Sequence, residues 1–180
     1  MKTSGYIFVF IAIIILTTTV IADELGIGVF FDPEGTQDWG TFNGGLGVIC
    51  TAYVCVVDVD MMVAGGSFKL DSDYPILLLS AAYADGVAIG EITEGVELGL
   101  ATPIPAFSGD TALLATLQMT VFEPWGLHPL SIVAHPNSVT PIVADSQALL
   151  WSAVGLTGYL EFGDLPSESL TWGDVKKLFH

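Results

Sequence analysis

Positive charge is scarce in this sequence of 180 residues. It contains no arginine and only four lysines, against 20 aspartates and glutamates, which gives a formal net charge of −16 at pH 7. Binding to phosphate backbones relies on Lys and Arg side chains that release condensed counterions. We therefore expect no nucleic-acid partner, and the acidic surface instead suits solubility, a saline setting or cation binding.

Long apolar runs are lacking after the N-terminus. The chain begins with Lys2, continues with an apolar run from Tyr6 to Leu16, and carries small residues at Val20 and Ala22. This order is typical of a secretory signal peptide, and the run is shorter than the about 20 residues of a membrane span. We expect residues 1–22 to be cleaved after Ala22, with an uncleaved anchor as the alternative. The mature chain would be secreted or held at the cell surface, with no membrane span.

Cysteine occurs only twice, at Cys50 and Cys55. Along a continuous strand these residues would lie about 16 Å apart on opposite faces, which is beyond disulfide reach. The four residues between them offer no turn residue, so two unpaired strand cysteines are expected, with a disulfide as the alternative. The sequence has no CxxC motif and no Cys/His cluster of the kind that binds zinc.

Catalytic motifs are absent from the sequence as well. It contains no Gly-x-Ser-x-Gly, HExxH, P-loop or GxGxxG pattern. His128 and His135 each precede a proline, which predicts that they lie in or beside loops rather than in a catalytic site. Acidic pairs for glycoside hydrolysis can be drawn only arbitrarily from so many carboxylates. We therefore predict that the protein is not an enzyme.

Short apolar segments separated by turn residues make up most of the chain after Ala22. A hydrophobic content of 52% with 13% charged residues is enough to bury a core. Turn sequences such as Asp32-Pro33-Glu34-Gly35 recur every 8–12 residues or so, which favours a β-sandwich or barrel. The predicted strands are Leu25 to Phe31, Leu46 to Val59, Met62 to Leu70, Tyr74 to Ala84, Val87 to Ile92, Gly95 to Ala101, Thr111 to Phe122, Leu130 to Ala134, Pro141 to Ala144, Ala148 to Val154 and Gly158 to Phe162.

These segments predict one all-β domain over residues 23–162, a single antiparallel β-sandwich. Gln37 to Gly45 is polar and rich in glycine, which indicates a loop. Thr102-Pro103-Ile104-Pro105 is expected to end the preceding strand, since proline cannot donate a ladder hydrogen bond.

The last 18 residues, 163–180, differ from the rest. A polar linker is followed by Thr171, a good helix N-cap, with Asp174 as its capping-box partner. This predicts a short C-terminal helix that is marginal on its own, so its apolar side must dock on its own sandwich or on another molecule. The side chains on that apolar side are Trp172, Val175, Leu178 and Phe179.

Two pairs of aspartates could serve as calcium ligands. Asp58 and Asp60 form one pair and Asp71 and Asp73 the other. Residues at i and i+2 of an extended chain point to the same side, and Ca²⁺ requires six to eight oxygens, so both pairs would have to converge. Ordinary turn chemistry is the alternative reading of the same residues.

Aromatic residues offer a second type of site. The candidates for stacking on a glycan are Trp39, Trp125, Trp151 and Tyr159. Trp39 and Trp125 fall in predicted loops, where exposed rings could stack on a glycan or contact a protein. Trp151 is expected to lie in the core.

The stretch from about Cys50 to Pro124 resembles the cohesin and carbohydrate-binding-module type of β-sandwich. The resemblance rests on Gly65 to Leu70, Leu77 to Tyr83 and Leu113 to Val121. It implies a nine-stranded, jelly-roll-like sandwich with a binding role, although no dockerin-facing motif can be placed. The ending also resembles that of short secreted bacterial proteins that carry a Thr-Trp-Gly-x-x-Lys tail.

These features together predict a secreted, non-catalytic module that binds an extracellular protein or glycan. The alternative is a structural subunit of an extracellular filament or matrix that self-associates through its N-terminal strand or C-terminal tail. Calcium is the only cofactor considered, and Trp39, Trp125 and the tail residues are the candidate contacts.

Overall fold

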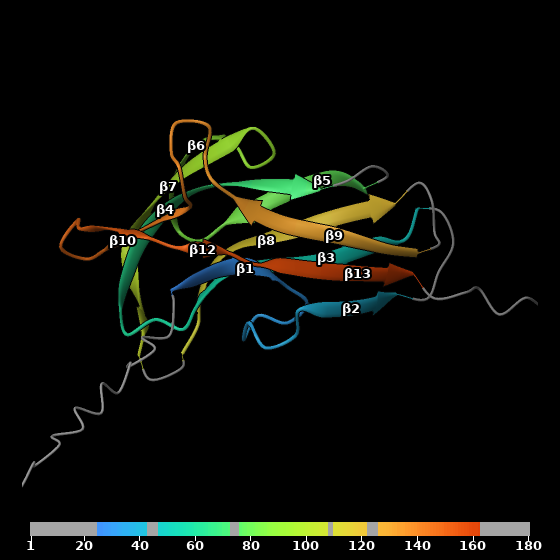
Figure 1. The fold of residues 1–180 in the computed structure, drawn as a ribbon, viewed down its shortest axis with the longest axis horizontal. Helices are drawn as coiled ribbons and strands as arrows, with labels where there is room; N and C mark the ends of the chain where they lie inside the picture. The colour runs from blue at the N-terminus through green and yellow to red at the C-terminus, as the bar shows by residue number, and fades with distance from the viewer. Residues whose placement is uncertain (1–24, 43–46, 73–75, 108–109, 122–125, 163–180) are drawn as a thin grey trace, which may run out of the picture.

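The computed structural model describes residues 25–42, 47–72, 76–107, 110–121 and 126–162. These ranges form strands, turns and loops (Figure 1), and within them no helix is long and apolar enough to cross a membrane. The expected signal peptide and C-terminal helix lie outside the described residues. The strands are β1 (Gly26–Phe30), β2 (Trp39–Phe42), β3 (Ile49–Val57), β4 (Met61–Ser72), β5 (Ile76–Tyr83), β6 (Gly86–Glu91), β7 (Gly95–Ala106), β8 (Ala112–Val121), β9 (Gly126–Val133), β10 (Ile142–Asp145), β11 (Leu150–Ser152), β12 (Val154–Gly155) and β13 (Thr157–Phe162).

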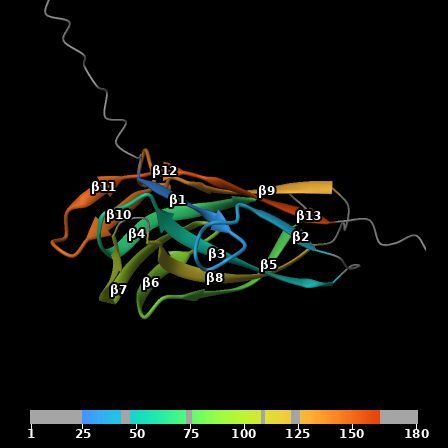
Figure 2. The ribbon, with the colours of Figure 1, turned by 90° about the horizontal axis from the view of Figure 1, so that it is seen from below.

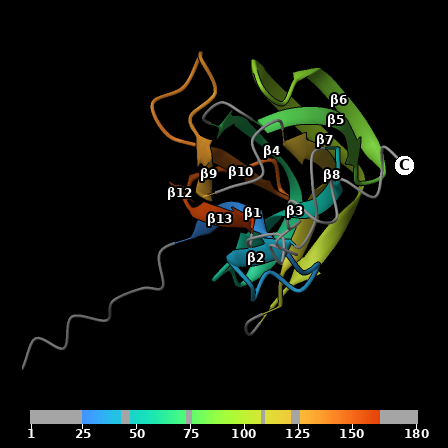
Figure 3. The same ribbon diagram turned by 90° about the vertical axis from the view of Figure 1, so that its right-hand side faces the viewer.

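The strands form two sheets that pack face to face. A five-stranded sheet has the order β12-β1-β3-β8-β5. An eight-stranded sheet has the order β11-β10-β4-β9-β13-β2, with β7 beside β4 and β6 beside β7. Figure 3 shows β9 and β13 on one side of the molecule and β8 and β5 on the other. The predicted all-β sandwich is therefore confirmed.

Most of the pairings are antiparallel, with two short exceptions. β1 runs parallel to β12, and β13 runs parallel to β2. Each exception places a strand from the N-terminal part of the chain beside one from the C-terminal part. As a result β1 has a partner on both sides, β3 and β12, within its own chain.

The core lies between the sheets and follows from the alternation of side chains along each strand. In β3, Cys50, Ala52, Val54 and Val56 point inward and are fully buried. Phe68 is the largest of the fully buried side chains and comes from β4 in the opposite sheet. Each such aliphatic or aromatic side chain contributes about 1.5–3 kcal/mol when it is removed from water.

Two glycines allow the chain to pass closely between the sheets after β11. A methyl group on Gly155 would overlap the carbonyl oxygen of Ile132, and one on Gly158 would overlap that of Val29. Both positions therefore require glycine because backbone lies where a side chain would start.

The cysteines lie where the strand spacing predicts. Cys50 faces the core, whereas Cys55 lies on the outer face of β3 with Phe30 and Val57, in a smaller buried cluster. Both are buried and free, so the expectation of two unpaired cysteines is confirmed.

Two segments differ from the sequence-based prediction. Part of the expected loop between Gln37 and Gly45 forms β2, which pairs with β13 through Trp39 and Tyr159. β7 does not end at Ala101, as predicted, but continues to Ala106, and Pro105 still lies opposite Met62 of β4. Pairing with β6 stops at Leu100, so the prolines occupy a stretch where the other side of the strand is unpaired.

Two single residues also differ from their predicted places. His128 lies inside β9 rather than beside a loop, and it is buried with its ring edge-on to Phe162 at a centroid distance of 6.0 Å. Trp151 is not a core residue, because 48% of it is exposed and its indole N–H donates to Asp145 Oδ2 at 3.1 Å.

Candidate functional site

A groove crosses the outer face of the eight-stranded sheet, over β7, β4, β10 and β11. Strand register gives one row of side chains through Ile89, Glu97, Ser67 and Ile142, since residues directly opposite each other share a face. The next row runs through Val87, Gly99, Gly65, Ala144 and Leu150. Figures 1 and 2 show these strands gathered toward one end of the molecule, away from β2.

Glycines form the floor of this groove. A side chain on Gly99 would meet nothing within 4 Å, so the space above it is open. A methyl group on Gly65 would overlap the Leu98 carbonyl oxygen, so this position has to remain glycine. The hollow beside them has a volume of about 320 Å³ and is lined by Gly66, Ser67, Glu97, Leu98, Ser138, Ile142, Ala144 and Leu150.

The groove combines apolar walls with few polar groups. Val87 and Ile89 on β6 are each 66% exposed, and Leu150 on the far wall is 72% exposed. Glu97 supplies a single carboxylate, and Ser67 and Ser138 supply hydroxyl groups. Exposed apolar side chains on two sides of a hollow, with a few polar groups between them, are common at protein-binding surfaces.

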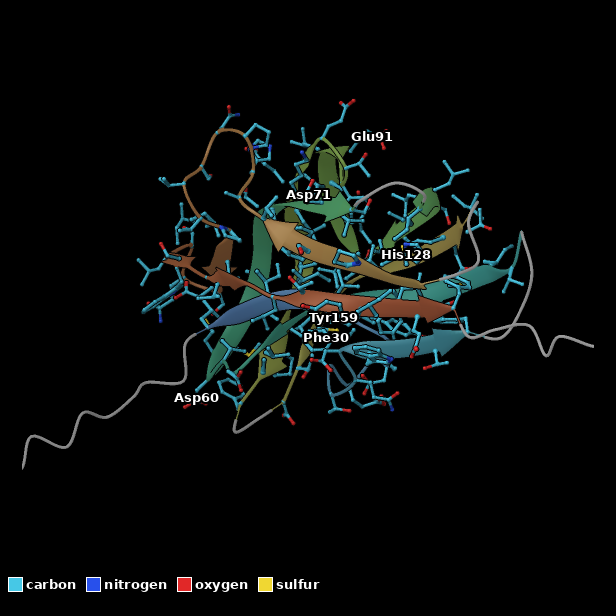
Figure 4. All side chains as sticks on the ribbon, turned by 45° about the vertical axis from the view of Figure 1, so that its right-hand side comes forward. Phe30, Asp60, Asp71, Glu91, His128 and Tyr159 are labelled. Carbon is cyan, nitrogen blue, oxygen red and sulfur yellow. The ribbon has the colours of Figure 1, made fainter. Side chains whose placement is uncertain are left out.

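A pair of aromatic rings lies on the same sheet, at β2 and β13. Trp39 is 46% exposed, and its ring centroid lies 5.7 Å from that of Tyr159 with the planes tilted by 33°. The Trp39 indole N–H donates to Glu161 Oε2 at 3.0 Å, which fixes the ring. Leu127 of β9 lies opposite Glu161 and is also exposed. Figure 4 shows Tyr159 on β13.

The predicted calcium ligands occupy separate parts of the fold. Asp58 and Asp60 lie in the β3–β4 turn, whereas Asp71 lies near the other end of β4; Figure 4 shows Asp60 and Asp71 far apart. Among the described residues no group of three or more His, Cys, Asp or Glu side chains could hold a metal ion. Asp73 lies outside those residues, so the calcium site stays a prediction.

The other predicted contact residues are not placed. Trp125, Trp172, Val175, Leu178 and Phe179 all lie outside the described residues. Of the predicted partner contacts, Trp39 is therefore the one that the structure places, and it is exposed as expected.

Sequence reasoning missed the groove altogether. Its residues come from five strands, β6, β7, β4, β10 and β11. The only local signals in the sequence were the glycine pair Gly65-Gly66 and the single glycine Gly99. Such glycines mark close backbone approach or open space, but sequence alone does not say which strands they face.

The turn that follows β1 carries Asp32, the carboxylate that accepts the most hydrogen bonds among the residues that the structure describes. Burial opposes ionisation of Asp32, but hydrogen bonds from the Thr36 hydroxyl and from the backbone N–H groups of Gln37 and Thr36 outweigh it and hold its pKa below the usual value. The same turn lies against the outer face of the five-stranded sheet. The hydroxyl group of Thr111, just before β8, donates to the Glu34 carbonyl oxygen at 2.7 Å and holds the turn there.

No protein-family model matches the chain, and no curated protein sequence matches it. Solved structures do resemble its fold. The third ScaB cohesin of R. flavefaciens, solved with a group 1 dockerin, has 16% sequence identity and a TM-score of 0.52, covering 81% of this chain and 98% of that one.

Two further structures give the same result. The cohesin module of a Clostridium perfringens family 33 glycoside hydrolase has 11% identity and a TM-score of 0.53, over 77% of this chain and 96% of that one. A type I cohesin of Clostridium thermocellum, solved with a dockerin, has 14% identity and a TM-score of 0.53, over 77% and 98%. The chain therefore has the cohesin-like β-sandwich fold.

Proposed function

We propose that this chain is a secreted, non-catalytic module that binds a protein partner in the Gly99 groove. The observation that carries the proposal is the open glycine floor between the exposed apolar walls of Val87, Ile89 and Leu150. Structures of similar fold were solved as cohesins in complex with dockerins, which supports a folded protein as the partner.

The chemistry of the groove indicates what the partner presents. An apolar anchor would fill the hollow of about 320 Å³, because a few anchor side chains that are well packed in a desolvated pocket carry most of the energy at such contacts. Glu97 would accept a hydrogen bond from a cationic or hydroxyl side chain next to that anchor. We therefore expect a partner helix or loop with one apolar anchor and a Lys, Arg, Ser or Thr beside it.

Filling the groove without straining the fold tests this proposal. Gly99→Leu places a side chain in open space, and its effect would be compared with that of Thr41→Leu at an exposed position of β2. Titration calorimetry against purified dockerin modules, including a group 1 dockerin, would measure binding. We expect at least a tenfold weaker association for Gly99→Leu and no change for Thr41→Leu.

Photo-crosslinking tests for protein partners other than dockerins. A benzoylphenylalanine at Val87 should capture a protein of the native extracellular environment, and the adduct should vanish when Gly99→Leu is added. The same probe at Thr41 should capture nothing. Equal capture at both positions, or an adduct that survives Gly99→Leu, would contradict binding in the groove.

A glycan site at Trp39 is the second candidate, because the ring is exposed, fixed by Glu161 and flanked by Tyr159. Pyranose rings stack on such faces, and the carboxylate can accept from sugar hydroxyls. Trp39→Ala should abolish retention in affinity electrophoresis with soluble polysaccharides. Trp151→Ala is the matched control, since Trp151 is equally exposed and equally bonded to a carboxylate, Asp145. Retention unchanged by Trp39→Ala would remove this candidate.

Export is part of the same proposal. N-terminal sequencing of protein recovered outside the cell should begin at Asp23, whereas an N-terminus that starts at Met1 would indicate an anchor. Filament assembly through the N-terminal strand or the tail stays an alternative; β1 is already paired with β3 and β12.

A further inference from the structure

A small pocket lies at the end of the sandwich where the β3–β4 turn and β11 come together. It has a volume of about 190 Å³ and is lined by Leu25, Asp58, Val59, Asp60, Met61 and Trp151. Figure 4 shows Asp60 at this end of the molecule. Neither the groove nor the Trp39 site uses these residues, so the pocket is a separate hollow with its own chemistry.

Trp151 forms the aromatic wall of the pocket because β11 is the last described strand of its sheet. Trp151 lies opposite Val143 of β10, which is fully buried, so both side chains lie on the inner face of the sheet. Since no described strand follows β11 there, 48% of Trp151 stays exposed. The hydrogen bond from its indole N–H to Asp145 fixes the ring. The fold thus holds an exposed indole in one orientation.

The usual chemistry of turns does not explain Asp58 and Asp60. The carboxylates of Asp32 and Asp145 accept hydrogen bonds from backbone N–H groups of their own turns. The carboxylates of Asp58 and Asp60 accept none from any described residue. The left-handed φ of 55° accounts for an aspartate at position 58, because Asp tolerates this conformation better than most residues, but no such requirement applies to Asp60.

No cation of the described chain neutralises these two carboxylates. Lys69 is the only Lys or Arg in the described ranges, and it lies eight residues along β4 from Met61. A strand rises about 3.3 Å per residue, which places the Cα atoms of Lys69 and Met61 about 26 Å apart. The pocket therefore presents uncompensated negative charge beside an exposed aromatic ring.

We propose that this pocket binds an organic cation, an alkylammonium group carried either by a lysine side chain or by a small free amine. The face of an indole ring attracts cations more strongly than the other aromatic rings do. Asp58 and Asp60 pair with the ammonium group, while the apolar side chains of the lining contact its alkyl carbons. Ca²⁺ fits this pocket less well, because it takes six to eight oxygen ligands and gains nothing from apolar walls.

The size and exposure of the pocket set the expected affinity. Drug-sized ligands occupy pockets of about 300–1,000 Å³, so a hollow of about 190 Å³ holds one side chain or a small amine. Asp58 and Asp60 are both exposed, so water and salt screen their charges. We therefore expect binding in the millimolar range that added NaCl weakens.

NMR titration of the ¹⁵N-labelled protein with n-butylammonium chloride tests the proposal. The indole N–H cross-peak of Trp151, assigned by its loss in Trp151→Phe, should shift in a saturable way, and that of Trp39 should not. The uncharged 1-butanol has the same alkyl chain and should cause no saturable shift at the same concentrations. Equal shifts with the alcohol, or no saturable shift with n-butylammonium, would overturn the proposal.

Charge-matched variants separate the pocket from the acidic surface as a whole. Asp58→Asn with Asp60→Asn should weaken n-butylammonium binding about fivefold or more. Asp38→Asn with Asp85→Asn removes the same charge at exposed positions elsewhere and should leave binding unchanged. An equal loss in the two double variants would mean that the amine is attracted to the acidic surface in general, which would overturn the site.

Removing the aromatic wall tests the remaining part of the proposal. Trp151→Leu keeps the wall apolar and should weaken n-butylammonium binding about as much as the loss of the two carboxylates, read from the backbone amide of Met61. An unchanged melting temperature would show that the variant is folded. Unchanged binding in a folded Trp151→Leu variant would contradict the role of the ring.

Two amino-acid derivatives distinguish the sources of the ammonium group. N-acetyl-lysine methylamide presents the cation on a side chain, and N-acetyl-norleucine methylamide is its uncharged analogue. Binding of the lysine derivative as tight as that of n-butylammonium would support a lysine of a partner protein, and binding of n-butylammonium alone would support a free amine. Equal shifts with the norleucine derivative would overturn the proposal. Gly99→Leu should alter none of these results, so this site and the groove fail separately.

Discussion

Asp32 shows how one side chain can organise a whole turn. Its carboxylate accepts from the Thr36 and Gln37 backbone N–H groups at 2.9 and 2.7 Å and from the Thr36 hydroxyl at 2.7 Å. We expect Asp32→Asn to lower the free energy of unfolding by about 1–3 kcal/mol, since an amide satisfies these donors less well. Urea denaturation measures the loss, and Asp38→Asn at an exposed carboxylate nearby should change little.

The acid dependence of stability gives an independent check on Asp32. Because its pKa is lowered in the folded chain, the carboxylate contributes stability above its unfolded pKa of about 3.9, and that contribution is lost as the pH falls through the folded pKa. Asp32→Asn should therefore lose stability less steeply than the wild type below about pH 4. Parallel curves for the two proteins would show that the carboxylate has no such role.

The thiols provide a second prediction for single residues. Burial raises the pKa of Cys50 to about 11, and burial together with the nearby Asp32 and Glu34 raises that of Cys55 to about 12. Since the thiolate is the reactive form, neither thiol should react with an aromatic disulfide reagent in the folded protein at pH 8. Both should react at once in guanidinium. A rapid reaction of either thiol without denaturant would contradict the buried placement.

The errors of prediction at single residues have a common cause. Trp151 was expected in the core, but its N–H group donates to Asp145, the last residue of β10, whose carboxylate also accepts from the Gln147 and Leu149 N–H groups of the following turn. His128 was expected near a loop because Pro129 follows it, but both lie in β9, which pairs with β13 on the side next to Phe162. In each case the residue that determines the burial of the side chain is either distant in sequence, as Phe162 is from His128, or is brought near by a turn, as Asp145 is to Trp151.

At the scale of the strands, the close approach of β13 to β1 at Gly158 leads to a specific prediction. Gly158→Ala would push a methyl group into the Val29 carbonyl oxygen, so we expect a loss of about 1–3 kcal/mol in the free energy of unfolding. Gly99→Ala is the matched control, since a methyl group there meets nothing and glycine is disfavoured in strands. Urea denaturation should rank Gly99→Ala at or above the wild type, and equal losses in both variants would refute the close approach.

Most strands were predictable, and the misses were specific. Alternating apolar residues bounded by turns placed β3, β4, β5 and β8 to within a few residues. β2 was missed because Trp39 to Phe42 is short and lies in a glycine-rich stretch, and it becomes a strand by pairing with β13 about 120 residues later. The predicted β7 was too short because the prolines at 103 and 105 were expected to end it. A strand tolerates proline where one of its two sides has no hydrogen-bonded neighbour, as here beyond Leu100.

For the whole molecule, the groove could not be predicted from local sequence. It forms because β6, β7, β4, β10 and β11 lie side by side in one sheet, and the strand order that brings them together is not visible in any one segment. Composition did report the net charge of −16. It did not report that, among the described residues, the charged side chains lie in the strands of the eight-stranded sheet and in the turns and not in the strands of the other sheet.

The large negative net charge predicts how the melting temperature depends on salt. Lys69 is the only cationic side chain in the described ranges, and no salt bridge occurs within them, so the carboxylates repel one another with little compensation. Raising NaCl from about 0.01 M to 0.15 M shortens the screening length from about 30 to about 8 Å. The melting temperature should therefore rise with salt, as calorimetry would show, and a fall would mean that unrecognised ion pairs dominate. CaCl₂ at equal ionic strength separates screening from binding: a larger rise that Asp58→Asn with Asp60→Asn abolishes would mark a calcium site, and equal rises would leave screening as the whole effect.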